Sequence, residues 1–301
     1  MTAADRPLHL YVHWPFCLRI CPYCDFNRAE AAEVDHAAWA RALLTELDSA
    51  AAGVNGRLAS IFFGGGTPSL MDPDTVGRIV ALARRLWPGG AAPEVSLEAN
   101  PGSLDRGRFA GFRDAGVTRL SVGVQALDDA ALRQLGRIHD AAEARRTVET
   151  ARALFPRVSV DAIYARPGQT VEAWAAELRD FAALGAEHMA CYQLTVEPGT
   201  DFHRQGVTGP GEDTAVALFE TTRAGLAAAG LPAYEVSNHA RPGAECQHNL
   251  GIWRGEPYLG IGPGAHGRVL AADGTWTATR RLQDPDRWRH AAESQGHGRA
   301  T

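Results

Sequence analysis

The fold is most constrained by a regular alternation of short β-rich runs with longer amphipathic stretches. The β-rich runs occupy residues 8–12, 58–63, 95–99, 119–124, 158–163 and 189–194. Helical periodicity covers residues 34–51, 74–86, 105–115, 141–154, 171–184 and 212–229. Strands that alternate with helices predict an α/β fold with a parallel sheet. Six such units favour an open (β/α)6 partial barrel, and the pattern alone leaves a doubly wound sheet as the alternative.

Polar and glycine-rich residues stand at or near the ends of the β-rich runs. In chain order they are Cys17, Gly64 to Thr67, Glu98, Gln125, Asp161 within the fifth run, and Gln193. Such residues at the carboxyl ends of strands mark the active face of a β/α barrel. Their positions therefore favour the barrel over the doubly wound sheet.

After residue 231 the alternation fades, and glycine, proline and scattered aromatic residues become frequent. This change predicts a barrel domain over residues 1–231 and a second, smaller C-terminal region over residues 232–301. The residues from 294 to 301 are polar, and we expect no capping element there.

Charge and composition exclude several classes of protein. The net charge of the 301 residues is −5 and no long basic run occurs, which argues against nucleic-acid binding as the main function. No segment approaches the ~20 apolar residues of a membrane span. The start of the chain lacks the pattern of a signal peptide. We therefore expect a cytoplasmic protein, in which the five cysteines are metal ligands or free thiols.

Three cysteines, Cys17, Cys21 and Cys24, form a CxxxCxxC motif. Three thiolates can hold three irons of a [4Fe–4S] cluster, whose usual protein set is four cysteines. The fourth iron is then open to S-adenosylmethionine, and one electron from the cluster can break its sulfonium bond to release a 5′-deoxyadenosyl radical. A zinc knuckle or unrelated buried thiols are the alternatives, but zinc sites favour two CxxC pairs or added histidines. We expect Cys191 and Cys246 to be buried and outside the cluster.

The surrounding sequence resembles the radical S-adenosylmethionine superfamily, and within it the HemN/HemW branch. The matching segments follow in order across residues 8 to 270. They are YVHWPFC (11–17), CPYCDFN (21–27), FFGGGTPS (62–69), EANPG (98–102), LSVGVQ (120–125), LGRIHD (135–140), VDAIY (160–164), YQLTVEPGT (192–200), YEVSN (234–238), HNLGIW (248–253) and YLGIGPGAH (258–266). The resemblance implies a (β/α)6 partial barrel that binds a [4Fe–4S] cluster and S-adenosylmethionine.

The resemblance also implies which residues contact S-adenosylmethionine. These are Tyr11, Tyr23, Gly65, Gly66, Thr67, Glu98, Gln125, Arg137 and Asp161. The glycine segment would hold the amino group of the cofactor, and the tyrosines would touch its methionine and adenine parts. Simple packing of the tyrosines, a plain turn at the glycines and an Arg137–Asp161 ion pair are the alternatives. The segment after Asp161 departs from the family, since Ala165 and Arg166 stand where relatives usually have glycine and an apolar residue.

The run from His248 to Trp253 resembles the HNxxYW motif of the HemW branch, which is linked there to heme binding. A histidine can ligate heme iron, so His248 is the candidate ligand. Ile252 replaces the tyrosine of the motif. A loop histidine that is solvated or hydrogen-bonded is the alternative, and Cys246 and His266 are further candidate ligands.

Phe26 separates two kinds of relative. Oxygen-independent coproporphyrinogen III oxidases usually read CxxxCxxCxC, and Phe26 takes the place of the fourth cysteine. The resemblance therefore implies a HemW-like heme chaperone that delivers heme to respiratory hemoproteins, with reduced flavodoxin or ferredoxin as electron donor. An oxidase that decarboxylates coproporphyrinogen III and an inactive truncated protein remain the alternatives. Relatives carry a further C-terminal domain, so we expect this chain to be a fragment.

Overall fold

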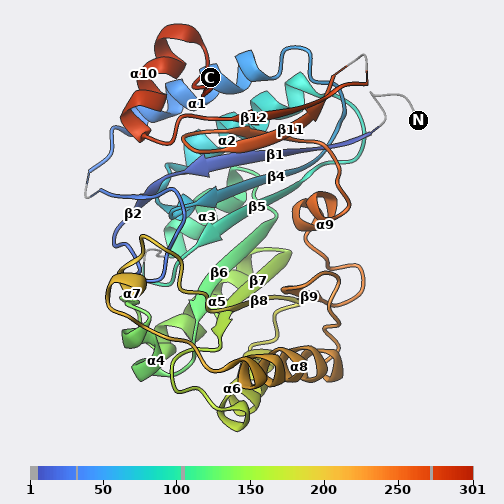
Figure 1. Ribbon diagram of the computed structural model, residues 1–301. Coiled ribbons are helices and arrows are strands. Elements are labelled where there is room, and N and C mark those ends of the chain that lie inside the picture. The colour runs from blue at the N-terminus through green and yellow to red at the C-terminus, as the bar shows by residue number, and fades with distance from the viewer. Residues whose placement is uncertain (1–5, 32, 103–105, 272–273, 301) are drawn as a thin grey trace.

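The computed structural model describes residues 6–31, 33–102, 106–271 and 274–300 (Figure 1). Its main sheet has the strand order β12-β11-β10-β1-β4-β5-β6-β7-β8-β9. The six central strands are parallel neighbours and match the six predicted runs: β1 (Pro7–Trp14), β4 (Arg57–Gly65), β5 (Glu94–Ala99), β6 (Arg119–Gln125), β7 (Arg157–Tyr164) and β8 (His188–Gln193). A doubly wound sheet reverses its order at a switch point. The order here is sequential, which confirms the partial barrel.

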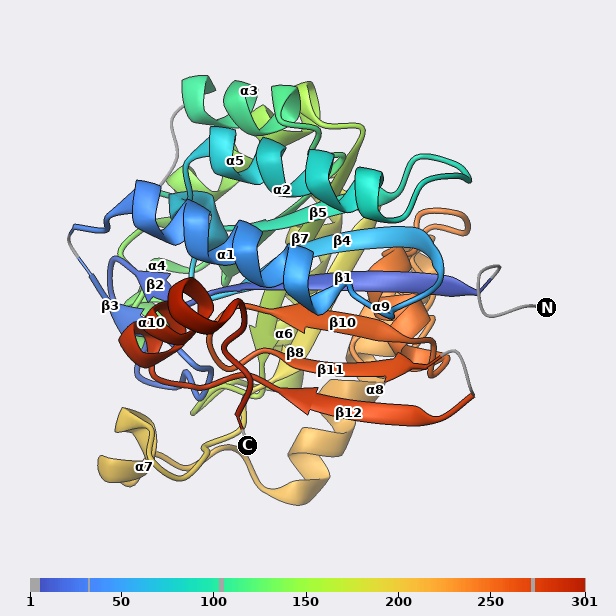
Figure 2. The ribbon, with the colours of Figure 1, turned by 90° about the horizontal axis from the view of Figure 1, so that it is seen from above.

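The six predicted helices are also present, each within about two residues of its expected ends. They are α1 (His36–Ala50), α2 (Pro73–Leu86), α3 (Arg106–Asp114), α5 (Ala141–Leu154), α6 (Val171–Ala183) and α8 (Glu212–Ala228). Side-chain oxygens of Asp35, Asp140 and Thr170 accept from backbone amides in the first turns of α1, α5 and α6. These caps satisfy amides that a helix leaves unpaired at its start. Figure 2 shows α1 and α2 lying over the sheet.

The two faces of the barrel strands differ in character. Leu8, Leu10 and Val12 of β1 belong to the apolar core between the sheet and the helices. The alternate residues of β1, such as His9 and Tyr11, are buried or half-buried on the inner face, where they meet side chains of β4. The barrel interior is therefore polar.

Residues after 231 extend the same sheet at both edges. β9 (Asn238–Ala240) pairs with β8, whereas β10 (Tyr258–Ile261) runs parallel to β1 and leads into β11 (His266–Leu270) and β12 (Trp276–Arg280). The short helix α9 (Gln247–Trp253) lies near the end of the barrel where the strands begin (Figure 1). The division at residue 231 stays a prediction.

The expectation of an end without a capping element is wrong. Helix α10 (Pro285–Gln295) packs on α1 and buries Trp288 completely. It ends at Gly296, whose φ of 79° is the left-handed conformation that commonly terminates helices. This packing could not be predicted from local sequence, because the partner, α1, lies about 240 residues earlier.

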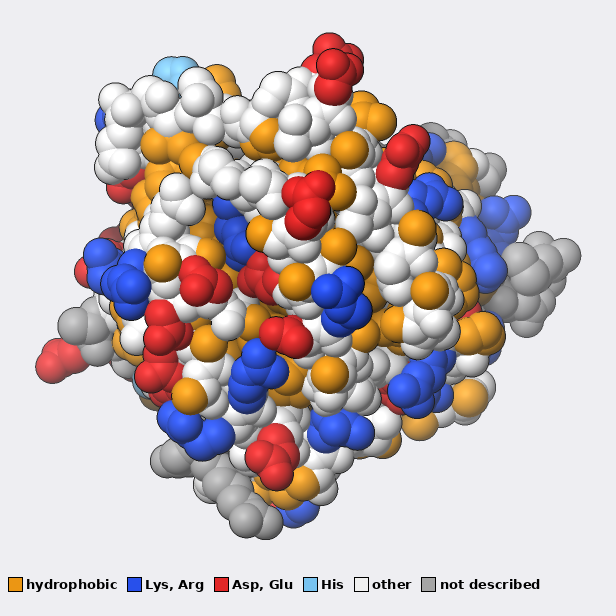
Figure 3. Space-filling model, turned by 90° about the horizontal axis from the view of Figure 1, so that it is seen from below, with side chains coloured by type: hydrophobic (Ala, Val, Ile, Leu, Met, Phe, Trp, Pro, Cys, Tyr) orange, Lys and Arg blue, Asp and Glu red, His pale blue; other side chains and the backbone are white. Residues whose placement is uncertain are grey.

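The surface below the barrel is mixed in charge. Figure 3 shows acidic and basic side chains interspersed on this face rather than gathered by sign. Within the described parts of the chain, no helix has both the length and the apolar character needed to cross a bilayer.

Candidate functional site

The three motif cysteines lie on one loop that is closed at its base. β2 (Phe16–Cys17) pairs with β3 (Ala29–Glu30), and the amide of Ala29 donates to the carbonyl of Pro15 over 2.8 Å. Inside the loop, the amide of Cys24 donates to the carbonyl of Cys21 over 3.0 Å. The loop therefore stands at the carboxyl end of β1, on the face expected for an active site.

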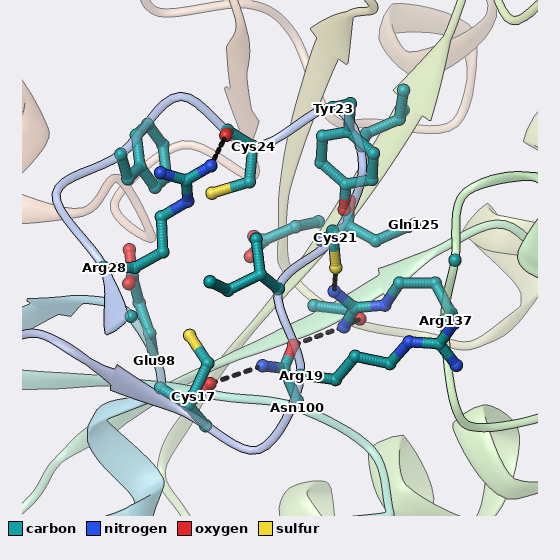
Figure 4. Close-up of a pocket in the computed structure, with 18 of the residues that line it drawn as sticks. Cys17, Arg19, Cys21, Tyr23, Cys24, Arg28, Glu98, Asn100, Gln125 and Arg137 are labelled. Carbon is teal, nitrogen blue, oxygen red and sulfur yellow. Dashed lines mark hydrogen bonds between the residues drawn. The ribbon is translucent and has the colours of Figure 1, made fainter. Parts of the chain in front are cut away.

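A cavity of about 460 Å³ opens beside this loop. The three cysteines line it together with eight of the nine residues expected to contact S-adenosylmethionine: Tyr23, Gly65, Gly66, Thr67, Glu98, Gln125, Arg137 and Asp161. Figure 4 shows the sulfur atoms of the three cysteines in this cavity. The structure thus brings together residues from five strands and loops. Tyr11 does not line this cavity.

The glycine segment after β4 has a structural role that the sequence did not reveal. The amide of Gly66 donates to the carbonyl of Trp14 over 2.7 Å, and the amide of Thr67 donates to that of Phe16 over 2.9 Å. A Cβ atom on Gly66 would lie only 2.7 Å from the carbonyl oxygen of Pro15. The glycines therefore allow the end of β4 to pack directly against the cysteine loop.

Arg137 and Asn100 connect the cysteine loop to the barrel strands (Figure 4). Arg137 donates from Nη1 to the sulfur of Cys21 over 3.3 Å, and from Nη2 to the Oδ1 of Asn100. Asn100 in turn donates from Nδ2 to the Oγ1 of Thr67 over 3.0 Å. Sequence reasoning missed Asn100, although it lies in a motif segment two residues after Glu98.

The alternative of an Arg137–Asp161 ion pair is not seen. Among the ion pairs of the described residues none joins these two side chains, and the Oδ1 of Asp161 instead accepts from the hydroxyl of Ser121 over 2.9 Å. Burial raises the pKa of Asp161, and the charge of Arg137 opposes this rise from a distance.

Two carboxyl groups in the cavity wall have strongly raised pKa values. Burial and the charge of Asp161 raise the pKa of Glu98 to about 8, although the amide of Gly65 donates to it over 3.2 Å. Burial raises the pKa of Asp161 to about 7, against the opposing effect of its bond from Ser121. The Oε1 of Gln125 is buried with no hydrogen-bond partner in the described structure. Buried polar groups need partners, so this wall suits a polar ligand.

The cysteine thiols are also in a desolvated setting. Burial raises the pKa of Cys17 and of Cys24, while a hydrogen bond from Thr67 lowers that of Cys17. Metal ions bind thiolates, so metal binding would release these protons. Among the described residues, no three histidine, cysteine or acidic side chains lie close enough together to hold a single metal ion. Three thiols on one cavity wall fit the donor set of an iron–sulfur cluster.

A second cavity of about 470 Å³, the lower chamber, lies at the other end of the barrel. It is lined by Tyr11, Phe62, His248 and Trp253, and it shares Glu98, Asp161 and Tyr192 with the first cavity. The two spaces therefore meet at one polar wall inside the barrel. Sequence reasoning did not anticipate this chamber, or Tyr192 as a residue of both.

His248 projects from α9 into the lower chamber. Only 7% of its surface is exposed, and its ring stacks on Phe62 with the centroids 4.9 Å apart. Burial lowers the pKa of His248 to about 3, so the imidazole is neutral at pH 7. His248 is therefore not solvated, whereas the hydrogen-bonded form of the alternative is present, because its Nδ1 lies 3.2 Å from the hydroxyl of Ser60. Cys246 is buried beside Ser96, and His266 is exposed on β11.

Comparison with known proteins decides the family. Residues 11–181 match the sequence profile of the Radical SAM superfamily. The chain belongs to this superfamily. A [4Fe–4S] cluster and S-adenosylmethionine are therefore its cofactors, as expected from the three cysteines.

Individual relatives show that the chain belongs to the HemN/HemW branch of the superfamily. The chain is 41% identical to the heme chaperone HemW of Escherichia coli, over 93% of this chain and 75% of that protein. It is 45% identical to the mouse mitochondrial radical S-adenosyl methionine domain-containing protein 1, over 98% of this chain and 69% of that protein. The solved structure of the coproporphyrinogen III oxidase HemN from Escherichia coli superposes with a TM-score of 0.81 at 22% identity, over 98% of this chain and 71% of that one. At this identity the superposition shows the fold alone.

Proposed function

We propose that this radical SAM protein is a heme chaperone of the HemW type. The observation that carries the proposal is the lower chamber, because a neutral, buried imidazole faces a cavity that adjoins the cysteine cavity. A neutral histidine can ligate heme iron. The identity of 41% to a protein named as a heme chaperone supports the same function.

The proposed cofactor contacts follow from the lining of the first cavity. Cys17, Cys21 and Cys24 would hold the cluster. S-adenosylmethionine would be surrounded by the other residues expected in this cavity, which are Gly65, Gly66, Thr67, Glu98, Gln125, Asp161, Tyr23 and Arg137. When both are bound, the cluster and S-adenosylmethionine supply one-electron cleavage of a sulfonium bond. Tyr11 would act from the lower chamber, behind the shared wall of Glu98 and Asp161.

The protein's own groups prepare this cavity in three ways. The guanidinium of Arg137 donates to the sulfur of Cys21 and so places a positive charge beside it. Glu98 and Asp161, with pKa values near neutrality, can take up or release a proton as ligands arrive. Gln125 offers an unpaired oxygen to a hydroxyl or amino group.

The proposal includes the partners. Heme would pass to hemoproteins of the respiratory type, and reduced flavodoxin or ferredoxin would donate the electron, in the cytoplasm for a bacterial protein. Apolar side chains of Leu18, Phe26 and Ile138 are exposed at the rim of the cysteine cavity, where a partner could approach the cluster.

Iron analysis tests the cluster assignment. Anaerobically reconstituted protein should bind about four irons, and Cys21→Ala should lose the brown chromophore. Cys246→Ala is the matched control, because Cys246 is buried outside the cavity of the motif cysteines. Loss of the cluster in Cys246→Ala would show that the ligand set is wrong.

A heme titration tests the function. Heme bound through an imidazole should give a sharp Soret band that shifts or disappears in His248→Ala, but not in His266→Ala, which changes an exposed histidine. Formation of protoporphyrinogen from coproporphyrinogen III would refute the chaperone function and favour the oxidase. An unchanged spectrum in His248→Ala would refute only the ligand.

A further inference from the structure

A chain of hydrogen bonds runs from the protein surface to His248. The carboxylate of Glu256 lies 2.8 Å from the Nε2 of His9, and the Nδ1 of His9 lies 2.7 Å from the hydroxyl of Ser60. That hydroxyl lies 3.2 Å from the Nδ1 of His248. Ser60 and His9 are almost completely buried, whereas the side chain of Glu256 is 27% exposed.

The carboxylate of Glu256 determines which atom of each later group in the chain carries the hydrogen. An ionised carboxylate can only accept, so the Nε2 of His9 must carry a hydrogen. The ring of His9 is almost completely buried, and a neutral imidazole that carries its hydrogen on Nε2 has a bare Nδ1. Ser60 must then donate its single hydroxyl hydrogen to His9. The second contact of the Ser60 hydroxyl, with the Nδ1 of His248, is then a hydrogen bond only if that nitrogen donates to the Ser60 oxygen.

These groups pack so closely that position 251 has no room for a side chain. Gly251 lies in α9 against the ring of His9, and a Cβ atom there would be 2.1 Å from its Nε2. The rings of His9 and His248 meet edge to face with centroids 5.8 Å apart. Since the Nδ1 edge of His248 faces Ser60, the Nε2 edge is left for the lower chamber that this ring lines.

We propose that Glu256, His9 and Ser60 are positioning residues that fix His248 in its Nδ1–H tautomer and so present a bare Nε2 to the lower chamber. Metal-ligating histidines are usually oriented by a hydrogen bond from the other ring nitrogen. The relay would make His248 a ready electron-pair donor to an iron that enters the chamber. The identity of that iron as heme rests on the proposed function, whereas the tautomer does not.

The relay predicts an inversion in Glu256→Lys. The ammonium of lysine can only donate, so its hydrogen bond to the Nε2 of His9 moves the hydrogen of His9 to Nδ1. His9 then donates to Ser60, Ser60 donates to the Nδ1 of His248, and the hydrogen of His248 moves to Nε2, where it blocks ligation. The same loss of function through a wrong tautomer is known from serine proteases whose buried aspartate is changed to asparagine.

Nitrogen NMR of the heme-free, full-length chain tests the tautomer directly. With ¹⁵N-labelled histidine, the signal of His248 is identified by its absence in His248→Gln. We expect an Nδ1–H tautomer in the unmodified chain, an Nε2–H tautomer in Glu256→Lys, and a mixture in Ser60→Ala. The matched control, Glu149→Lys on the exposed face of α5, should change nothing. An Nε2–H tautomer in the unmodified chain, or the same tautomer in all variants, would overturn the relay.

Heme titration adds a second readout. Glu256→Lys should weaken ferric heme binding by about tenfold or more, the usual effect of losing an orienting partner, while Glu149→Lys should bind as the unmodified chain does. Equal binding in the two variants, with the tautomer inverted, would show that the Nε2 of His248 does not ligate and would overturn the proposed purpose of the relay. If the unmodified chain binds no heme, the chaperone function fails, and the NMR result alone decides the relay.

Discussion

At the scale of single residues, Glu98 and Asp161 are the most unusual groups in the barrel. Both are half-buried, both line the two cavities, and partial burial and the charge of Asp161 raise the pKa of Glu98. Two partly buried carboxyl groups that interact in this way favour a state in which at least one is protonated. In the ligand-free chain they therefore make stability depend on pH.

The sign of this dependence follows from the raised pKa values. A carboxyl group whose pKa rises on folding, here from 4.5 to about 8 for Glu98, binds its proton more tightly in the folded chain. The contribution of this group to the free energy of unfolding is complete at low pH and is lost as the pH rises through about 8. The free energy of unfolding, measured by urea titration, should therefore fall between pH 5 and pH 8.5. Glu98→Gln should lessen this fall by on the order of 2 kcal/mol. The exposed Glu149→Gln should leave it unchanged, and an equal fall in both variants would contradict the assignment.

Ala165 provides a second test at this scale. Its φ of 59° is left-handed, a conformation that costs most residues about 1–2 kcal/mol and glycine little. Ala165→Gly should therefore stabilise the chain by about 1 kcal/mol in thermal or urea unfolding. The same substitution at Ala224, exposed in the middle of α8, should destabilise it by about 1 kcal/mol. Destabilisation by both variants would show that the turn after β7 carries no such strain.

The sequence identified only part of this polar interior. Glu98, Gln125 and Asp161 could be predicted because they stand at or near the ends of β-rich runs and belong to the motif segments. His9 and Ser60 could not, because alternating polar residues in a strand usually face water. Their partners, Glu256 and His248, lie 247 and 188 residues away in the sequence, so only the folded chain shows the relay.

At the scale of elements, α9 is held in place by what it contacts. A seven-residue helix has little stability of its own, and glycine weakens it further. Gly251 is nevertheless required, because its missing side chain leaves room for the ring of His9. The helix thus seats His248 in the chamber through close packing rather than through helix propensity.

Two glycine-to-alanine variants separate packing from propensity. Gly251→Ala should destabilise the chain by about 1–3 kcal/mol, because its Cβ atom would overlap the ring of His9. Gly77→Ala in α2 should instead stabilise by about 0.5–1 kcal/mol, since its Cβ atom would lie 3.5 Å from that of Ala115 in ordinary contact. Urea unfolding measures both. A stabilising Gly251→Ala would mean that His9 does not lie against α9.

The same dependence on distant contacts explains which elements the sequence predicts. The six central strands and six helices carry their own periodicity, and their ends are found within about two residues. β10 has four residues including Gly260, and it exists because it pairs with β1, about 250 residues earlier. Short elements of this kind have too little local signal to be predicted.

At the scale of the whole molecule, one buried carboxylate joins the beginning of the chain to its last described residues. Glu46 of α1 accepts from the amide of Gly262 over 2.8 Å, from the indole nitrogen of Trp288 over 2.9 Å and from the amide of Gly298 over 2.7 Å. It also forms an ion pair with Arg281 over 3.2 Å. Both ionic side chains are completely buried. Glu46 therefore adds a polar link from α1 to α10 and to the segments around Gly262, Arg281 and Gly298.

A double-variant cycle tests this connection. Glu46→Gln would leave the Arg281 guanidinium buried without a counter-charge, and burial already lowers the pKa of Arg281. Removing one partner of a buried ion pair typically costs about 3–5 kcal/mol, whereas replacing the pair with apolar groups costs much less. Urea unfolding should therefore show that Glu46→Gln is strongly destabilised, and that adding Arg281→Met restores part of the loss. Hydrogen exchange should show increased opening of α10 in the single variant. If the losses of the two single variants simply add in the double variant, Glu46 and Arg281 are not coupled, and the ion pair does not contribute to the attachment of α10.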